Sequence, residues 1–519
     1  MSRRAPALLC VIISALMMAT PSAGAAQADA AAQASRLVNE GVALLRSDRA
    51  EEAERCFTQA IALAPSNPDA HYFLGFVFER RKQLDQAAQA YRRAIDLRPL
   101  MAEAHDRLGF TLGLQGHTDQ ALARFEQAVA LNPALFDAQY HLGVTQWLRR
   151  APQSALAPLD AAVTLQPRHA EAHYYLGLTL RALGRLPEAI GHLEKATTLA
   201  PTLAVAYAHL GIAQREHGDL DAARRSLGRA LELEPGRFDA LNALGLTLMQ
   251  RGDADLAVAT FTQLVAAHPA EASARLNLGT ALMQQGDLAG AVTVLRALTA
   301  LRPGHAEAFY NLGTALKQQD DFAGAEAALR EAIRLDPRLP DAHYTLGVVL
   351  WQTSRAAEAI DAFEAAVGAK PDYAQAHYML GTILRQEGRL GEALAEFRQA
   401  LKYEPESAEA HLSIGQVLRQ QNDVAGADQA LAQADRLNKR KADAQAAVFA
   451  LSVGRERLKQ NEVAAAVERL KEAVRLDPRN AQAHAELARA LERQGDVRGA
   501  RLHLAEARRL DPTLTAGER

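Results

Sequence analysis

The chain has 519 residues and a formal net charge of −3; hydrophobic residues make up 49% of it, and aromatic residues only 5%. Alanine and leucine supply most of the apolar content, which favours closely packed helices over a sheet core. The near-neutral charge and the lack of a basic run argue against the electrostatic surface that nucleic-acid binding needs.

The first 25 residues have the composition of a secretory leader. Two arginines precede an apolar stretch at 8–18, and Ala23 and Ala25 then form a small-residue cleavage pattern. We therefore expect a signal peptide and an exported mature chain, either periplasmic or secreted. The alternative is an uncleaved anchor, which is disfavoured because the apolar stretch is too short to span a bilayer comfortably.

A 34-residue period runs through almost the whole remaining chain. Glycine recurs at this interval twelve times between Gly41 and Gly415, and proline and alanine recur in fixed register with it. Such a period is typical of repeat proteins, in which each unit buries its apolar faces only by stacking on its neighbours.

We number each unit so that the recurring glycine is position 8. Positions 4, 7, 8 and 11 then lie on one face of a first helix, A, and positions 20, 24 and 27 on one face of a second helix, B. A second glycine often stands at position 15, where it suits the C-cap of helix A. Proline at position 32 ends helix B. Each unit is therefore predicted to be a helix–turn–helix.

These residues resemble the tetratricopeptide repeat family, whose pattern is W-x-x-L-G-x-x-Y, then A-x-x-x-F, then A, then P. One unit here reads His71-x-x-Leu74-Gly75-x-x-Phe78, then Ala87, Tyr91, Ala94 and Pro99. The resemblance covers residues 34–512 and departs from the pattern at position 4, which is seldom aromatic and often histidine. It implies an all-α, right-handed α-solenoid of about 14 repeats.

The period slips once. After Gly415 the next matching glycine is Gly454, so five residues are inserted, and position 32 of the twelfth unit is Lys439 instead of proline. The stretch 436–441 is basic and polar. It is interpreted either as a lengthened solvated helix or turn, or as a hinge or partner site. The predicted organisation is a signal peptide at 1–25, a lead-in at 26–33, twelve in-register repeats at 34–438, an irregular insertion at 439–446, two further repeats at 447–512 and a tail at 513–519.

Histidine is the residue type that most suggests a chemical site. Seven histidines stand at position 4, namely His71, His105, His173, His343, His377, His411 and His484. Equivalent positions belong to different helix pairs, whose axes pack about 8–10 Å apart, whereas a metal ion needs ligands about 2 Å away. We therefore expect half-buried packing residues, no metal and no cofactor. The sequence has no phosphate loop, HExxH motif or nucleophile elbow, so we expect no enzyme activity.

A binding face is predicted on helix A, at positions 2, 5, 9, 12 and 13, because these lie opposite the packing face. In the tetratricopeptide family that face lines a concave groove. Position 5 is tyrosine at Tyr72, Tyr140, Tyr174, Tyr310, Tyr344 and Tyr378. Position 12 holds the tryptophans Trp147 and Trp351 and the cations Arg181, Arg215, Lys317, Arg385 and Arg419. Exposed aromatics are favoured anchors at interfaces. The alternative is that they fill the space between neighbouring A helices.

Two functions fit this reasoning. The first is a scaffold that binds partner proteins or extended peptides in the groove, in a cell-envelope assembly or export process. The second is a non-catalytic subunit that presents substrates to an enzyme, such as a glycosyltransferase. Neither function involves nucleic acid or a membrane span in the mature chain.

Overall fold

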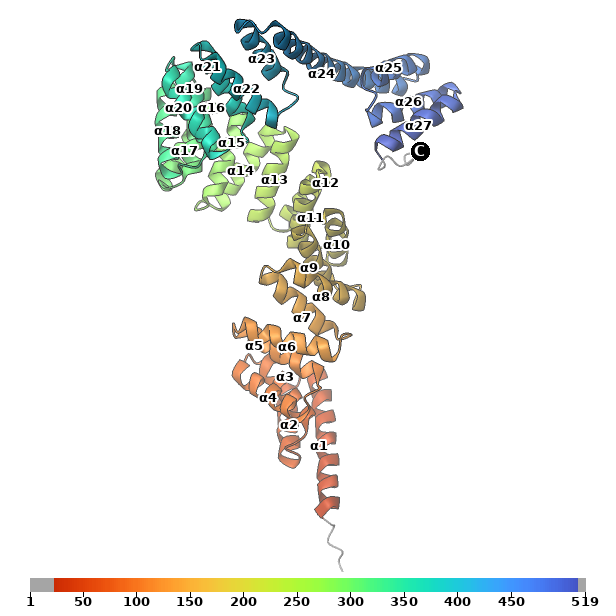
Figure 1. The fold of residues 1–519 in the computed structure, drawn as a ribbon. Coiled ribbons are helices and arrows are strands. Elements are labelled where there is room, and N and C mark those ends of the chain that lie inside the picture. Colours follow the sequence, from red (N-terminus) through yellow and green to blue (C-terminus); the bar gives the residue numbers. More distant parts are fainter. Residues whose placement is uncertain (1–22, 512–519) are drawn as a thin grey trace, which may run out of the picture. The chain divides into compact units, whose positions relative to one another are not determined.

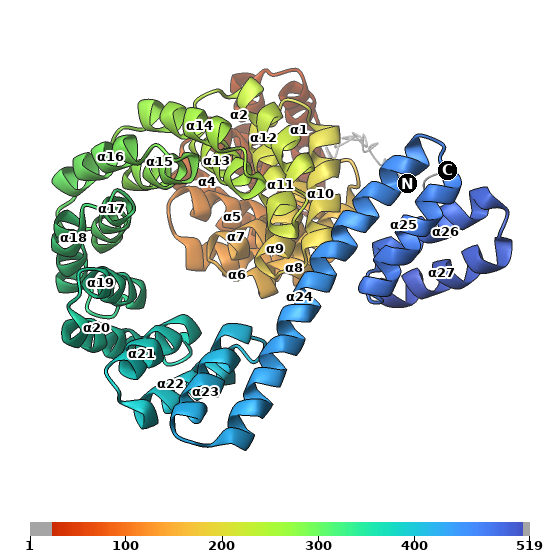
Figure 2. The same ribbon diagram turned by 90° about the horizontal axis from the view of Figure 1, so that it is seen from above.

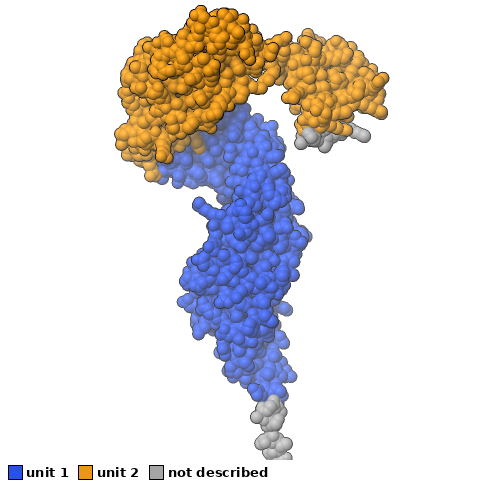
Figure 3. Space-filling view, viewed as in Figure 1, with its two compact units in different colours: residues 1–274 blue, residues 275–519 orange. Residues whose placement is uncertain are grey.

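The computed structural model describes residues 23–511, and the regular structure in that range consists of 27 α-helices and no strands (Figure 1). The all-α repeat fold predicted from the sequence is confirmed. The helices fall into two compact units, residues 1–274 and 275–519 (Figure 3). The predicted leader lies outside the described residues except for its last three positions, which begin α1. The predicted tail at 513–519 lies outside them altogether.

The helices follow one another in pairs. Unit 1 contains α1 (Ala23–Arg46), α2 (Ala50–Leu63), α3 (Pro68–Arg80), α4 (Leu84–Leu97), α5 (Ala102–Leu114), α6 (Thr118–Leu131), α7 (Phe136–Leu148), α8 (Pro152–Leu165), α9 (Ala170–Ala182), α10 (Leu186–Leu199), α11 (Ala204–His217), α12 (Leu220–Leu233), α13 (Phe238–Arg251) and α14 (Ala254–Ala267). The boundary between the units falls within α15 (Ala272–Gln285).

Unit 2 continues with α16 (Leu288–Leu301), α17 (Ala306–Gln318), α18 (Phe322–Leu335), α19 (Pro340–Gln352), α20 (Ala356–Ala369), α21 (Ala374–Gln386), α22 (Leu390–Tyr403), α23 (Ala408–Gln420), α24 (Val424–Lys459), α25 (Val463–Leu476), α26 (Ala481–Gln494) and α27 (Val497–Leu510). Odd-numbered helices up to α23 are A helices, and even-numbered helices up to α22 are B helices. Within each unit, a B helix contacts the A helix of its own repeat and that of the next.

Position 8 is glycine because helices A and B of one repeat approach too closely there for a β-carbon. A Cβ added to Gly245 would lie 2.4 Å from Cζ of Phe261, the residue at position 24. The same clash, at 2.5 Å, would join Gly143 to Cγ of Leu159. The position-24 side chain is fully buried at this contact, since neither Phe261 nor Leu159 has any exposed surface. The recurring glycine and the large residue sixteen positions later form one packing unit.

Position 15, between the two helices, has a left-handed backbone. Glycine adopts it at seven of these sites, for example at Gly218 with φ of 93°, where it caps α11 as the sequence predicts. Other residues adopt it elsewhere, among them Lys82 at 58° and Arg150 at 60°. A side chain in this region costs about 1 kcal/mol relative to glycine. The tight turn is therefore imposed by helix packing even where the residue does not favour it.

The structure differs from the sequence prediction at the register slip. Residues 439–446, predicted as an irregular insertion, lie inside α24, a continuous helix of 36 residues (Figure 1). The first half of α24 is helix B of repeat 12, and the second half is helix A of repeat 13. The lengthened helix, one of the interpretations of the slip, is therefore what the structure has, and the label of an irregular insertion is wrong. No proline or glycine interrupts 427–453, so the five extra residues extend the helix instead of opening a turn.

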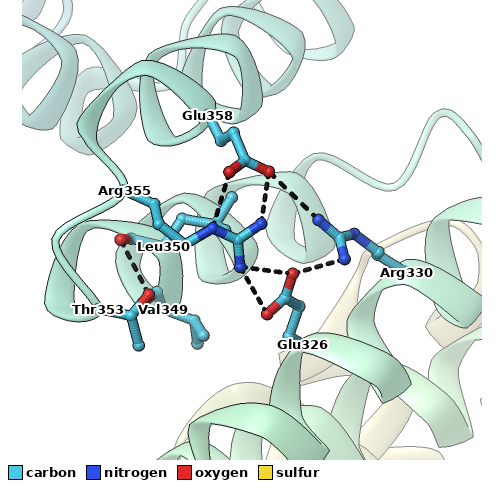
Figure 4. A network of polar contacts seen from close by, with 7 residues as sticks. All are labelled: Glu326, Arg330, Val349, Leu350, Thr353, Arg355 and Glu358. Carbon is cyan, nitrogen blue, oxygen red and sulfur yellow. Dashed lines mark hydrogen bonds and ion pairs between the residues drawn. The ribbon is translucent and has the colours of Figure 1, made fainter.

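Ion pairs link neighbouring repeats on the B-helix side. In Figure 4, Arg355, the residue before α20, donates from Nη1 to both oxygens of Glu326 on α18, at 2.8 Å each. Its Nε also donates to Glu358 at 2.7 Å, and Arg330 joins Glu326 at 2.5 Å. Arg355 also precedes Glu358 by three residues, an arrangement repeated by Arg49–Glu52, Arg185–Glu188 and Arg389–Glu392. Each such exposed pair contributes little alone, and a network contributes more.

Replacement of Gly245 by alanine should destabilise the chain by about 1–3 kcal/mol, because Phe261 must move to admit the new methyl group. Gly228, in the middle of α12, provides the matched control, since a Cβ there meets no atom within 4 Å. Gly228→Ala should stabilise by about 0.5–1 kcal/mol. Urea and thermal unfolding midpoints test both variants. If both midpoints moved in the same direction, the close-approach explanation of position 8 would fail.

Candidate protein-binding groove

The A helices leave one face uncovered. In α19, the residues at positions 3, 7, 8, 10 and 11 are buried, namely Ala342, Leu346, Gly347, Val349 and Leu350. Tyr344, Val348 and Trp351, at positions 5, 9 and 12, are half-buried, and Asp341 and Gln352, at positions 2 and 13, are exposed. Within unit 2, Figure 2 shows α17, α19 and α21 on the inner side of a curve and α16, α18 and α20 on its outer side. The uncovered positions are thus those predicted to line a groove.

All six position-5 tyrosines are half-buried, because each packs against the next repeat along the chain or against its own. The Tyr140 hydroxyl donates to Oε2 of Glu171, at position 2 of the next repeat, at 3.2 Å, and its ring meets that of Tyr175 edge-on at 6.2 Å. Tyr344 lies 5.2 Å from Tyr373, centroid to centroid. Burial raises the pKa of Tyr72 to about 12. These phenols therefore stay neutral and can donate hydrogen bonds.

The position-12 tryptophans also reach toward the following repeat. Trp147 is half-buried and meets Tyr175 edge-on at 5.6 Å. Trp351 donates from Nε1 to Oε1 of Gln386, at position 13 of the next repeat, at 3.3 Å. Each indole therefore bridges two repeats and keeps part of its surface exposed. The space-filling alternative describes the buried part of each ring, and the groove role of the exposed part stays a prediction.

Four of the five position-12 cations are half-buried, and two of these four contact the following repeat. Arg181 donates from Nη1 to Nδ1 of His209 at 3.2 Å and pairs through Nε with Glu216 at 3.2 Å. Arg385 donates to Gln416. Arg215 and Lys317 are half-buried. Arg419 is the exception, since it is exposed and pairs at 3.3 Å with Asp428 of its own repeat.

Sequence reasoning missed the aromatic residues that complete these clusters. Tyr373 and His169 occupy the position just before an A helix, and Tyr175 occupies position 6. Tyr373 donates to Oδ1 of Asp341 at 2.8 Å, next to Tyr344. The available signal was an aromatic ring at a helix-capping position, where a small polar residue is usual.

A shallow cavity of about 880 Å³ in unit 2 is lined in part by Asp341, the residue that accepts the hydrogen bond from Tyr373. Tyr310 and the apolar side chains of Leu301 and Leu339 line it, with the carboxylates of Glu307 and Asp341 at its edge. Arg302 and His305 line it as well, so the cavity offers aliphatic, aromatic and both kinds of charged group to an extended peptide segment.

The position-4 histidines have a structural role that explains their recurrence. Each donates a hydrogen bond from Nε2 to the carbonyl oxygen of the position-32 proline six residues earlier: His71 to Pro65, His105 to Pro99, His173 to Pro167, His343 to Pro337, His377 to Pro371, His411 to Pro405 and His484 to Pro478, at 3.0–3.3 Å. Gln139 makes the equivalent bond to Pro133 at 2.9 Å. Histidine here clasps the turn that enters each A helix, and an amide can replace it.

Two of these histidines have a second histidine beside them. His173 lies 2.9 Å from His192, Nδ1 to Nδ1, and His484 lies 3.0 Å from His503. Because Nε2 of His173 donates to a carbonyl, its Nδ1 accepts from His192 when both rings are neutral. Burial lowers the pKa of both His173 and His192. Within residues 23–511, histidine, cysteine, aspartate and glutamate form no group of three or more placed to hold a metal ion.

Comparison with known proteins supports the repeat assignment. A tetratricopeptide repeat model matches residues 38–102, 114–167, 153–204 and 451–514. A second model, the C-terminal domain of cilia and flagella-associated protein 70, matches residues 219–451. The segments that the first model matches are assigned to the tetratricopeptide repeat family. Proteins of this family generally mediate protein–protein interactions, and neither matching model describes an enzyme.

Several solved structures match parts of this chain with TM-scores below 0.5. YrrB, described as a TPR protein with an unusual peptide-binding site, has 25% identity and a TM-score of 0.34, over 36% of this chain and 96% of its own. Yeast Tom70 has 15% identity and a TM-score of 0.41, over 75% and 96%. Pseudomonas aeruginosa pilF has 20% identity and a TM-score of 0.37, over 41% and 96%. No curated protein matches the chain. No helix in the described range is both long and apolar enough to cross a membrane.

His209, the hydrogen-bond partner of Arg181, should make stability depend on pH. Burial, and then the Arg181 guanidinium, lower the pKa of His209 to about 4. An unfolded histidine titrates near 6.5, so between pH 6.5 and 4 the unfolded chain binds a proton that the folded chain does not. Stability should therefore fall with acidification across this window, by up to about 1.4 kcal/mol per pH unit from this group.

His209→Gln should flatten that dependence, and His217→Gln, at an exposed position of the same helix, is the control. Unfolding midpoints at several pH values between 6.5 and 4 measure the slope. An unchanged slope in His209→Gln would show that this imidazole is not the group responsible.

Proposed function

We propose that the protein is a non-catalytic scaffold that holds extended segments of partner proteins along its A-helix groove, in a cell-envelope assembly or export process. The observation that supports this most directly is the uncovered face of the A helices. There Tyr310 lies on one repeat, and Tyr344 and Trp351 lie on the next, each with part of its ring exposed.

The chemistry of this face suits peptide recognition. Rings held on two repeats at once are already ordered before a partner arrives, so little conformational entropy is lost when they are covered. Neutral phenols and the exposed glutamines at position 13, such as Gln352 and Gln386, can donate to and accept from a peptide backbone. Carboxylates at position 2, such as Glu307 and Asp341, favour basic side chains in the bound segment.

The groove proposal predicts that removal of the indoles weakens partner capture. Residues 26–519 immobilised on beads would be compared with Trp147→Ala, Trp351→Ala and the double variant, using extract from the source cells. Capture should fall on the order of tenfold for each tryptophan that anchors the partner. Leu256→Ala is the control, because Leu256 is 55% exposed on the B helix α14, away from the groove. Equal capture by wild type and the double variant would count against the groove.

Export is part of the proposal and rests on the amino-terminal sequence. Two arginines, an apolar stretch at 8–18 and the Ala23-x-Ala25 pattern fit a leader cleaved after Ala25. The protein recovered from the periplasm or medium of a bacterial host should therefore begin at Ala26, as measured by amino-terminal sequencing. Arginine in place of Ala25 should block this processing. An intact chain found only in the cytoplasm would refute export.

A further inference from the structure

Position 3 of helix A shows whether a repeat is covered by the repeat before it. This position is alanine with 0% exposure at Ala70, Ala104, Ala138, Ala172, Ala206, Ala240, Ala308, Ala342, Ala376, Ala410 and Ala483. In repeat 13 the same position, in the second half of α24, is Phe449, whose side chain is 71% exposed. Val448 beside it is 62% exposed.

Position 10 of helix A also differs between repeat 13 and the stacked repeats. It is a small or β-branched residue with 0% exposure in stacked repeats, as at Val77, Thr111, Val349 and Ile383. In repeat 13 it is Glu456, which is exposed. A phenyl ring and a carboxylate do not fit the tight contact that alanine and valine make elsewhere. Repeat 13 is therefore built not to stack on repeat 12.

Repeat 12 correspondingly has the features of an array end. Its position-24 residue, Leu431, is partly exposed, whereas Phe363 and Phe397 at position 24 of the two preceding repeats have 0% exposure. The position-24 residue of the last repeat, Leu504, is partly exposed in the same way. Within unit 2, α24 thus ends one stack of repeats and begins another. In its second half, the face that a preceding repeat covers elsewhere is exposed.

The starting face of repeat 1 carries polar side chains instead of apolar ones. In repeat 1, the first repeat of the 34-residue period, position 3 is Arg36, and Asn39 and Glu40 follow on the same helix; all three are exposed. An unoccupied starting face is therefore polar here, as expected for a capping repeat. Phe449 and Val448 at an equivalent starting face indicate that another molecule covers them.

The charges next to this apolar pair specify what kind of molecule. Arg436, Lys439 and Lys441 precede it on α24, and no ion pair of these three is present in the described part of the chain, although Arg440 between them pairs with Glu406. Asp443 is the sole acidic residue between 436 and 455, in a chain whose net charge is −3. A second copy of this face would bring the same cations together, so charge opposes self-association through it.

Alanine connects the cations to the aromatic ring. Ala442 and Ala446 are exposed one turn apart on the side of α24 that leads to Phe449. Small side chains let another helix approach closely, and Phe449 would then fill a gap on that helix.

We propose that the exposed face of α24 from Arg436 to Phe449 binds an acidic amphipathic helix of a partner protein. Apolar side chains of that helix cover Val448 and Phe449, and its carboxylates pair with Lys439 and Lys441, which lie about 80° to either side of Phe449 around α24. Of these residues only Val448, at position 2 of repeat 13, stands at a groove position, so the surface operates whether or not the groove of the first twelve repeats binds a peptide.

Two synthetic 18-residue helices test the chemistry. Both carry leucine and alanine on one face; one has glutamate and the other lysine on the opposite face. Fluorescence anisotropy with residues 26–519 should show binding of the glutamate peptide, weakened by salt, and none of the lysine peptide. Phe449→Ala, and Lys439→Glu combined with Lys441→Glu, should each raise Kd on the order of tenfold. Leu502→Ala is the control, since Leu502 is 66% exposed on α27.

A photoreactive phenylalanine analogue at position 449 then tests the site in cells, with the cross-linked peptide identified by mass spectrometry. An acidic segment with apolar residues at helical spacing supports the proposal. A segment of this same chain, a basic or uncharged segment, or no cross-link overturns it, as does equal affinity of the glutamate peptide for wild type and Phe449→Ala. Circular dichroism confirms that each variant is folded.

Discussion

The contact between a bare position-8 backbone and a large position-24 side chain determines the geometry of the whole chain. At Gly245 the two helices leave no room for one methyl group beside Phe261. Because this distance is fixed, the angle between helices A and B is fixed too, and each repeat presents nearly the same surface to the next. Regular stacking then follows, and so does the repeated exposure of the same A-helix positions.

The clasp at position 4 complements this contact. The glycine sets how helices A and B meet within a repeat, whereas the histidine–proline hydrogen bond sets how helix A leaves the turn from the previous repeat, as in His105 to Pro99. In the repeats that have both, such as the one that contains His105 and Gly109, the two contacts fix both joints of the chain. The groove residues can then vary from repeat to repeat without disturbing the scaffold, which is how one fold can offer acidic, aromatic and cationic stretches in turn.

The fold could be predicted from the sequence because its signals are periodic: the spacing of Gly211 and Gly245 alone gives the unit length, and apolar positions give both helices. The site was harder to predict. Position 5 and position 12 could be assigned to one face, but their contacts with the next repeat depend on the offset between A helices, which no single-repeat pattern contains. Tyr373 and Phe449 were missed for a related reason, since each is an exception whose meaning appears only by comparison with the same position elsewhere.

The continuous helix α24 also has a consequence for how the protein unfolds. Repeat arrays are cooperative because each repeat is stabilised by its neighbours. Between Asn438 and Ala446 almost every residue of α24 faces water, so the helix there is held by its own hydrogen bonds and by one exposed ion pair, Arg440 with Glu406. Short unsupported helices are marginally stable, and fraying at this point breaks the thermodynamic coupling. Repeats 13 and 14, with their own buried core around Leu470 and Leu487, thus form a separate cooperative block that can melt and refold while repeat 12 stays intact.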